Sequence, residues 1–330
     1  MKKCLIGTTF FILLLVANIP ASSTTVPTTT SNPQIGGKTL YVGGLGPNNY
    51  TTIQEALNAA SAGNTVFVYD DSSPYHENIL ISTSVSLIGE EKTTTIIDGM
   101  NHGNSINITA DNVMVTGFTI ENGNDSGVII NSNNDTITNN IISNNIYGIR
   151  TSFGQPFGAT FSHNSITYNN IIDNGGGITF FSGSNNTIAY NLVSHAEQGI
   201  VIIGGSDNNI SWNTVAQSGF GIWILSTYHT VIYRNNITHN SNVGVWTFIT
   251  SADTILQNNF IGNNRSAISF EGPLSRLSMF KNKVHFPLHR NVWRQNYWGE
   301  SRLLPYIIPG IYLKITFQID WLPAQKPYSI

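Results

Sequence analysis

Gly199-Ile200-Val201-Ile202 and Gly221-Ile222-Trp223-Ile224 are two copies of a pattern that recurs through residues 127–284 of this 330-residue chain. Each copy alternates with a second pattern, Ile-x-x-Asn-x-apolar. Its asparagines step by 29, 22, 22, 22, 23 and 24 residues, at Asn140, Asn169, Asn191, Asn213, Asn235, Asn258 and Asn282. A fixed period in the low twenties, with period-two alternation inside each unit, is typical of a solenoid of strands. The repeats therefore predict stacked coils in one elongated domain.

The composition supports a folded chain with few charges. Charged residues make up 10% of the chain and hydrophobic residues 40%, and the net charge is −3. An average soluble protein carries about 25% charged residues. The periodic apolar residues argue against disorder, and a net acidic, secreted chain is not expected to bind nucleic acid.

The N-terminus has the features of a secretory signal peptide. Lys2 and Lys3 precede an apolar run at 10–17, and small residues follow at 21–23. The run is too short to span a bilayer, so no transmembrane segment is expected after cleavage. Cleavage removes Cys4, the only cysteine, and lowers the net charge from −3 to −5 because both lysines leave. We expect a secreted protein, extracellular or at the cell surface, without disulfides.

The remaining boundaries follow from composition. We predict a signal peptide at 1–23, a Ser/Thr/Pro linker at 24–37, a β-helix at 38–298 and a C-terminal covering tail at 299–330. Thr52-Ile53-Gln54-Glu55 is a capping box that opens a short amphipathic helix. A helix of this size suits one open end of a solenoid, where the first coil would otherwise expose its apolar interior.

The repeated asparagine is interpreted as structural. An inner Asn at the same corner of every coil is able to bond the coils on either side and pair backbone groups that a tight turn leaves free. The Asn ladder is therefore not offered as a functional site.

Several motifs carry a resemblance to a known family. They are Tyr50-Thr-Thr-Ile-Gln-Glu-Ala56, Ser86-Leu-Ile-Gly89, Ile96-Ile-Asp-Gly99, Asn296-Tyr-Trp298 and the tail Asp320-Trp-Leu-Pro-Ala-Gln-Lys-Pro-Tyr328. With the Asn-laddered coils, they resemble the pectin-lyase-like superfamily, in particular its NosD-type, carbohydrate-binding and sugar-hydrolase group as found in archaeal and bacterial surface proteins. The resemblance implies an all-β, right-handed, single-stranded parallel β-helix with a tail packed outside. The group includes lyases, hydrolases, epimerases and copper-site maturation factors, so no catalytic residue carries over.

Outward positions of the Gly-apolar-x-apolar strands predict an apolar face. The second and fourth residues after each glycine should point outward, in columns with one residue per coil about 4.8 Å apart. The second-position column is Ile129, Arg150, Thr179, Val201, Trp223, Trp246 and Ser269, and the fourth-position column is Asn131, Ser152, Phe181, Ile203, Leu225, Phe248 and Glu271. We select as substrate-binding candidates Trp223, Trp246, Phe181, Phe248 and Arg150.

Such a face is larger than a soluble monomer normally exposes, so something should cover it. One cover is the tail itself, residues 303–330. A second is a partner, either another copy or another surface protein. The third is a polysaccharide whose sugar rings stack on Trp223 and Trp246.

A polar column after the ladder asparagines contains Asn144, Asp173, His195, Gln217 and His239. Asp173 and His195 lie on adjacent coils and could act as a general base with its orienting partner, or supply part of a metal site. His239 is two coils beyond His195, near 10 Å away. A further column, at the turn before each Asn strand, contains Asp207, His229 and Asp253. No outward column holds three acids, and no carboxylate pair for glycoside hydrolysis is evident.

These observations favour a non-catalytic secreted or surface protein that binds polysaccharide or other envelope components. The competing hypothesis is a polysaccharide lyase, hydrolase or epimerase that uses Asp173, His195 and His239. A weaker one is copper handling of the NosD kind, which suits the sequence poorly because the mature chain lacks Cys and its Met114 and Met279 are scattered. We expect no metal site and no cofactor, with Ca²⁺ as the open alternative.

Overall fold

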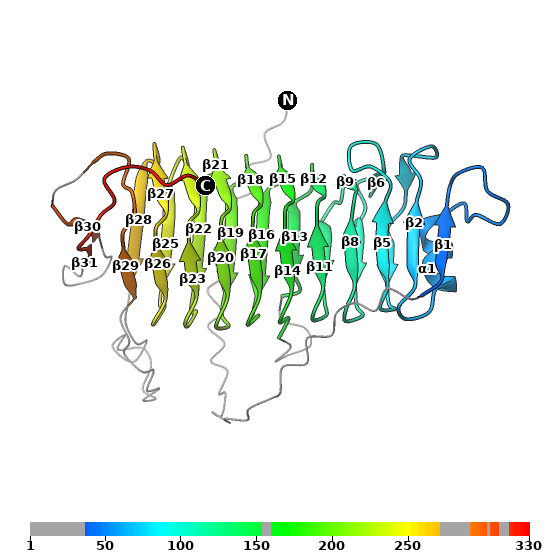
Figure 1. Ribbon diagram of the computed structural model, residues 1–330, viewed down its shortest axis with the longest axis horizontal. Coiled ribbons are helices and arrows are strands. Elements are labelled where there is room, and N and C mark those ends of the chain that lie inside the picture. The colour runs from blue at the N-terminus through cyan, green and yellow to red at the C-terminus, as the bar shows by residue number, and fades with distance from the viewer. Residues whose placement is uncertain (1–36, 154–159, 271–290, 302–303, 310–316) are drawn as a thin grey trace, which may run out of the picture.

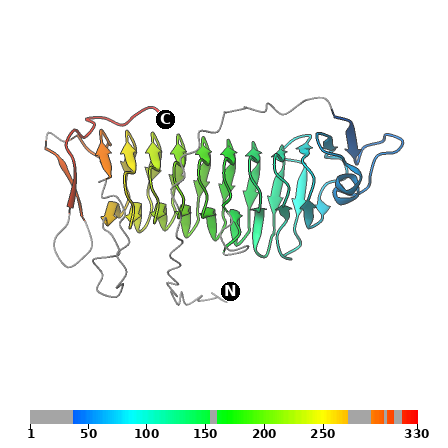
Figure 2. The same cartoon turned by 90° about the horizontal axis from the view of Figure 1, so that it is seen from below.

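The computed structural model describes residues 37–153, 160–270, 291–301, 304–309 and 317–330. In this part of the chain the fold is a parallel β-solenoid in which a typical coil adds one strand to each of three sheets (Figure 1). The coils stack along the long axis of the molecule, and strands of successive coils lie side by side (Figure 2). The predicted all-β parallel β-helix is confirmed. The predicted signal peptide lies outside the described residues.

Among the described residues sheet 1 has 11 strands, and it starts each regular coil. Its strands, in spatial order, are β1 (Thr39–Val42), β2 (Thr65–Val68), β5 (Ser86–Gly89), β8 (Met114–Thr116), β11 (Thr136–Thr138), β14 (Ser165–Thr167), β17 (Thr187–Ala189), β20 (Asn209–Ser211), β23 (Val231–Tyr233), β26 (Thr254–Leu256) and β29 (Val292–Arg294).

In the part of the chain that the structure describes, sheets 2 and 3 have nine strands each. Sheet 2 contains β3 (Tyr75–His76), β6 (Ile96–Asp98), β9 (Thr119–Glu121), β12 (Ile141–Ser143), β15 (Asn170–Ile172), β18 (Leu192–Ser194), β21 (Thr214–Ala216), β24 (Asn236–Thr238) and β27 (Asn259–Ile261). Sheet 3 contains β4 (Ile79–Ile81), β7 (Ile106–Ile108), β10 (Ser126–Ile130), β13 (Tyr147–Thr151), β16 (Gly176–Phe181), β19 (Gln198–Ile203), β22 (Phe220–Leu225), β25 (Val243–Phe248) and β28 (Arg265–Phe270).

The core is a set of inward columns that the in-register pairing creates. On sheet 1, for example, every strand from β11 to β26 contributes one fully buried isoleucine: Ile137, Ile166, Ile188, Ile210, Ile232 and Ile255. Burying an aliphatic side chain of this size contributes about 1.5–3 kcal/mol. Because the isoleucines repeat with the period of the coils, they form a continuous apolar interior.

Each corner between two sheets places one residue outside in the left-handed conformation and the next one inside. At the corner between sheets 1 and 2 (corner 1/2), the inside residues are the predicted asparagines. Asn169 shows the pattern: its N–H donates to Asn191 Oδ1 at 3.0 Å, and its Nδ2 donates to the Ile137 carbonyl at 2.8 Å. The same bonds recur from Asn140 to Asn258, so the structure confirms the ladder.

Similar inner columns occupy the other two corners. Corner 2/3 carries Asn145, Asn174, Ser218, Asn240 and Asn263, and corner 3/1 carries Asp135, Asn164, Asn186, Asn208, Thr230, Asp253 and Asn291. The sequence analysis predicted the corner 1/2 column alone.

The N-terminal end is covered by the predicted helix, α1 (Ile53–Ala59). Thr52 is its N-cap, and the Thr52 side chain accepts the Glu55 N–H at 3.2 Å, as the capping box predicts. The Glu77 carboxylate accepts two further N–H groups of the first turn, those of Ile53 and Gln54, at 2.8 and 2.9 Å. Ile53, Ala56 and Leu57 face the core.

The C-terminal end is covered by the antiparallel pair β30 (Tyr306–Pro309) and β31 (Phe317–Asp320). Trp298 stacks between Phe260 and Tyr306, with centroid distances of 4.5 and 4.0 Å. Asp320 accepts hydrogen bonds from the backbone of Gln295 and Asn296 and from Trp298 Nε1.

The last residues of the tail then run back over the outside of the solenoid (Figure 2). Tyr328 exchanges two hydrogen bonds with Asn259 and donates its hydroxyl to the Gln295 carbonyl. The described part of the tail therefore seals the end and packs near corner 1/2.

Two register predictions need correction. The predicted columns place Ser269 and Glu271 two and four residues after Ala267, as if Ala267 stood for the repeat's glycine. Trp246 pairs with Ile268, so Ile268 takes the place of Ser269 in its column, and Phe248 pairs with Phe270. Glu271 lies outside the described residues. The ladder partner that accepts the Asn258 N–H is Asn296, 38 residues on, and not Asn282. Asn282 itself lies outside the described residues.

One member of corner 3/1 is a buried carboxylic acid. Asp135 is fully buried, accepts the Val113 N–H at 2.8 Å and accepts the Ser132 hydroxyl at 2.6 Å. Burial raises the pKa of Asp135 from 3.8 to about 7, and the nearby Asp111 carboxylate adds to the rise. The unfolded chain would release this proton near pH 4 while the folded chain holds it to about pH 7. The contribution of protonated Asp135 to the free energy of unfolding is therefore full below pH 4 and is lost as the pH rises to 7.

Asp135→Asn should remove this pH dependence, because asparagine keeps an acceptor for Val113 and already occupies the same column at Asn164. We expect the variant to exceed the wild type in free energy of unfolding at pH 8 by a few kcal/mol, about 1.4 kcal/mol per unit of pKa shift, and to match it near pH 4. Denaturant unfolding at pH 4, 6 and 8 measures this. Asp111→Asn, at an exposed acid, is the control and should show a much smaller gain. Parallel pH profiles for wild type and Asp135→Asn would contradict the prediction.

Candidate functional site

The outer face of sheet 3 carries the predicted substrate-binding residues. In-register pairing aligns Thr179, Val201, Trp223, Trp246 and Ile268 in one outward column. It aligns Phe181, Ile203, Leu225 and Phe248 in a second column two residues further along. The structure therefore brings four of the five candidates onto one apolar surface and places Arg150 in line with Thr179, on the adjacent strand β13.

The indole rings of Trp223 and Trp246 do not form the open stacking surface for sugar rings that the sequence predicts. Their rings stack on each other, with centroids 4.9 Å apart and planes 8° apart. Phe220 packs against both rings, at 5.9 and 5.5 Å. Trp223 is 7% exposed and Trp246 is half-buried. A sugar ring needs an accessible aromatic face, and here each indole turns one face to the other.

A hollow of about 410 Å³ lies beside this surface, lined by Asp125, Tyr147, Arg150, Phe153 and Phe181. Phe153 packs edge-on against Phe181 at 4.9 Å and is 66% exposed. Arg150 lies over the Tyr147 ring, 5.7 Å from its centroid. Two of the predicted residues, Arg150 and Phe181, therefore meet in one depression with exposed aromatic walls.

A charge pair forms the polar side of this hollow. Arg150 Nη2 forms a short ion pair with Asp125 Oδ2, and Arg150 Nε donates to Asp125 Oδ1 at 3.2 Å and to Ser126 Oγ at 2.8 Å. The Asp125 side chain keeps 39% exposure and that of Arg150 keeps 15%. The pair presents a carboxylate acceptor and guanidinium donors to the hollow, with its net charge near zero.

The sequence analysis missed Asp125, Tyr147 and Phe153. Ser126 pairs with Tyr147 across β10 and β13, which puts Asp125 one coil below Arg150. Arg150 is the only charged residue of its outward column. A partly buried guanidinium requires an acid on an adjacent coil, so Arg150 was the residue that could have indicated Asp125 from the sequence.

The polar column at corner 2/3 is present as predicted, with Asn144, Asp173, His195, Gln217 and His239 all in the left-handed region. Asp173 and His195 meet at 3.9 Å, and both side chains are more than half exposed. His195 Nδ1 also lies 3.2 Å from Ser194 Oγ. The geometry brings this pair together in open solvent, which makes the interaction weak.

His239 is not part of that pair. It lies two coils further along, beyond Gln217, and its ring covers Gly262, where a Cβ atom would approach the imidazole to 2.7 Å. The three proposed catalytic residues therefore do not form one site: Asp173 and His195 are neighbours, and His239 is separate.

The column predicted at corner 3/1 is partly wrong. Asp207 and His229 do form an exposed pair, at 3.5 Å. Asp253 lies inside the corner and is fully buried, where its carboxylate accepts the Thr230 N–H at 2.7 Å and the Thr227 hydroxyl at 3.0 Å. The sequence-based prediction gave Asp253 an outward position at this corner, whereas in the structure it occupies the inward position.

An unpredicted aromatic column follows corner 1/2. Tyr168 and Tyr190 stack at 4.9 Å, Tyr190 and Trp212 at 6.0 Å, and Arg234 lies 4.9 Å from the Trp212 centroid. Tyr168 and Tyr190 are 57% and 47% exposed. Since the Tyr168 and Tyr190 rings are stacked face to face, each turns one face to the other and not to solvent.

The donor groups of the described residues do not fit a metal centre. No group of three or more His, Cys, Asp or Glu in the part of the chain that the structure describes is arranged to hold an ion. The histidine pairs at the corners have one carboxylate each, and soft thiolate or clustered thioether ligands for Cu(I) are not found among these residues.

Comparisons with known proteins agree with the fold. A family model described as periplasmic copper-binding protein (NosD) matches residues 57–303, about three quarters of the chain. No curated protein matches the sequence.

Several solved structures are similar at low identity. XylC, in a complex with xylose, has a TM-score of 0.51 and 10% identity, covering 79% of this chain and 83% of that chain. The enzymatically active domain of tailspike protein 2 of bacteriophage CBA120 has a TM-score of 0.49 and 14% identity over 72% of this chain and 47% of its own, so the present chain spans about half its length. The A-module of the mannuronan C-5 epimerase AlgE4 of Azotobacter vinelandii has a TM-score of 0.46 and 15% identity, covering 66% and 76%.

The stacked indoles should contribute chiefly to stability. We expect Trp223→Ala to lower the free energy of unfolding by about 3 kcal/mol, because it removes a large, 7% exposed ring and leaves Trp246 without its stacking partner. Leu192→Ala, on the outer face of sheet 2 with 38% exposure, is the control and should cost less than about 1 kcal/mol. Denaturant unfolding measures both. Equal, small effects would show that Trp223 is a surface residue available to ligands.

Proposed function

The chain belongs to the NosD family, and we propose that it is an extracytoplasmic β-helix protein that binds polysaccharide in the hollow beside the outer face of sheet 3, without cleaving it. This proposal keeps the function expected from the sequence but places the binding site at different residues. The binding residues become Asp125, Tyr147, Arg150 and Phe181, and Trp223 and Trp246 become packing residues next to them.

The hollow itself carries the proposal. Its exposed aromatic walls suit the apolar C–H faces of sugar rings, and one carboxylate and one guanidinium at its side suit their hydroxyl groups. Because Arg150 and Asp125 hold each other, they need little ordering when a ligand arrives. XylC, which has the same fold, was solved with xylose.

The arrangement favours binding over hydrolysis. Glycosidases use two carboxyl groups about 5–9.5 Å apart, and Asp125 is the single carboxylate among the residues that line the hollow. Asp125 is also tied to Arg150, which leaves it poorly suited to act as a free base. The Asp173–His195 pair lies at corner 2/3 and remains the candidate site if the protein is an enzyme.

Copper handling is not supported by the donor groups described above, although the family's description is a periplasmic copper-binding protein. We keep from that description the extracytoplasmic location, which agrees with the signal peptide proposed at 1–23, followed by a linker at 24–37, the β-helix at 38–298 and the tail at 299–330. Among the described residues, no helix has the length and apolar character needed to cross a membrane. The proposed partners are envelope polysaccharides, with self-association or other surface proteins at the apolar outer face as the alternative.

Affinity electrophoresis of the secreted protein in gels containing xylan, alginate or polygalacturonate tests the proposal. We expect retention on at least one polysaccharide, weakened tenfold or more by Phe181→Ala, which removes a wall of the hollow, and by Asp125→Asn, which breaks the pair with Arg150. Tyr190→Ala is the control, because it removes an aromatic ring that is 47% exposed from another face.

Two results would contradict the proposal. One is retention that neither hollow variant changes. The other is the appearance of new reducing ends that are lost in His195→Ala, since this would identify the protein as an enzyme with its site at corner 2/3.

A further inference from the structure

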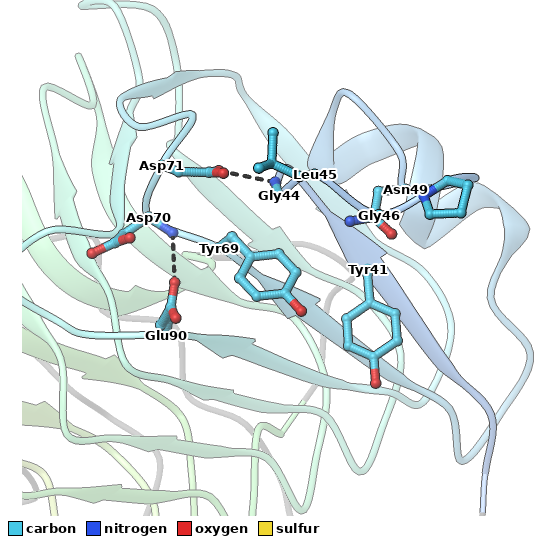
Figure 3. A pocket seen from close by; sticks show the side chains of 10 residues that line it. Tyr41, Gly44, Leu45, Gly46, Asn49, Tyr69, Asp70, Asp71 and Glu90 are labelled. Atoms are coloured by element: carbon cyan, nitrogen blue, oxygen red, sulfur yellow. Dashed lines mark hydrogen bonds between the residues drawn. The ribbon is translucent and has the colours of Figure 1, made fainter.

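We propose that a second hollow, at the N-terminal end of sheet 1, binds a neutral sugar ring and discriminates against acidic sugars (Figure 3). The hollow measures about 640 Å³ and is lined by Tyr41, Gly44, Leu45, Gly46, Pro47, Asn49, Tyr69, Asp70, Asp71 and Glu90. These residues come from β1, from the end of β2 and from the loops that follow both strands, together with the turn after β5. The site lies outside the repeat, so the columns of the solenoid do not predict it.

Its floor is aromatic. Tyr41 and Tyr69 have nearly parallel rings, with centroids 6.0 Å and planes 21° apart, and Phe67 packs edge-on against both. Tyr41 is 43% exposed. Figure 3 shows the two tyrosine rings side by side along the hollow, in contrast to the buried stack of Trp223 and Trp246. The apolar face of one sugar ring is well matched to such a pair.

Its wall consists of three carboxylates that the protein holds in place. Asp71 Oδ1 accepts the Gly44 N–H at 2.9 Å, and Glu90 Oε2 accepts the Asp70 N–H at 3.1 Å. Asp70 Oδ2 accepts the Thr94 hydroxyl at 2.6 Å. The second oxygen of each carboxylate accepts no hydrogen bond from the described residues. These oxygens are acceptors only, so the ligand must supply donors.

The loop above the floor is fixed before any ligand binds. Asn49 Nδ2 donates to the Gly43 carbonyl at 2.6 Å, and the Gly43 N–H donates to the Tyr50 carbonyl at 2.9 Å. Gly44 has φ +73°, and a Cβ there would lie 2.7 Å from the Tyr69 ring, so the backbone runs directly against the aromatic floor. A preformed site loses little entropy on binding.

The lining selects the class of ligand. It includes three acids and no Lys, Arg or His, so uronic and sulfated sugars are repelled. The three acids are not arranged to hold a metal ion together, as is true of every acid and histidine group among the described residues. Hydroxyl groups that donate to carboxylates form charge-assisted hydrogen bonds, which are stronger than neutral ones. A neutral sugar with its C–H face on Tyr41 and Tyr69 and its hydroxyls toward Asp70, Asp71 and Glu90 satisfies both features.

This site is independent of the hollow beside sheet 3, which lies on another face of the solenoid. Isothermal titration of the whole secreted protein with neutral xylo-, cello-, malto- and mannohexaose, and with hexagalacturonate, tests it in a Phe181→Ala background. In that background the sheet 3 hollow is disabled. We expect at least one neutral hexasaccharide to bind, and hexagalacturonate to bind tenfold more weakly or not at all.

Variants then locate the binding. Tyr41→Ala should weaken it tenfold or more, and Tyr41→Phe should keep it because the ring face makes the contact. Glu90→Gln should weaken the neutral ligand about threefold and reduce the discrimination against hexagalacturonate. Tyr168→Ala, at an exposed tyrosine of corner 1/2, is the control and should have no effect.

The proposal is wrong if no neutral hexasaccharide binds to Phe181→Ala, or if Tyr41→Ala binds as tightly as its parent. The two proposals fail separately. If wild type binds a hexasaccharide and Phe181→Ala does not, the binding belongs to the sheet 3 hollow alone. If both proteins bind it equally and Tyr41→Ala removes the binding, it belongs to the N-terminal hollow alone.

Discussion

The hydrogen bond from the inner asparagine of corner 1/2 to the next coil is the interaction on which this structure depends. A left-handed corner turns the chain between two sheets in a single residue, and it leaves the following backbone N–H without a strand partner. In the ladder, that N–H donates to the side-chain oxygen of the Asn one coil further on, as Asn191 does to Asn213 at 3.0 Å. Each bond contributes about 1 kcal/mol, and an unpaired buried N–H would cost about 1–3 kcal/mol. Because the bond is repeated at three corners, it fixes both the corner conformation and the register of the coils.

That register determines what the exterior can do. Outward residues repeat once per coil, so equivalent residues lie close enough to stack on each other, as Trp223 does on Trp246 and Tyr168 on Tyr190. Stacked columns stabilise the solenoid, but their aromatic rings cover one another's faces. Faces become available to ligands where the regular repeat is absent: at Phe153, beyond the end of β13, and at Tyr41 in β1 and Tyr69 directly after β2. The two hollows described above lie at such places.

The sequence therefore predicts the regular part well and the sites less well. The Asn140-to-Asn258 ladder and the apolar columns of sheet 3 follow from the period of the sequence, and the capping helix follows from the capping box at Thr52. Both are local patterns of the chain. The step to Asn296 was missed because 38 residues separate it from Asn258. Ser269 was placed in the wrong column because Ala267 imitates the repeat's glycine, and Asp253 was placed outside because Asp is common in turns. Asp125, Tyr69 and Glu90 could not be assigned to sites, since their neighbours come from turns and strand ends whose positions periodicity does not specify.

Native-state hydrogen exchange of Asn213→Ala measures the ladder bond most directly. In the wild type, the Asn191 N–H should exchange as slowly as the strand amides of Ile188 and Ile210. In Asn213→Ala its acceptor is missing, and the Asn191 N–H should exchange at least tenfold faster, while the Asn140 N–H, three coils away and still bonded to Asn169, should be unchanged. Unchanged protection of Asn191 in the variant would show that the corners hold without the ladder, and would contradict the account of this fold.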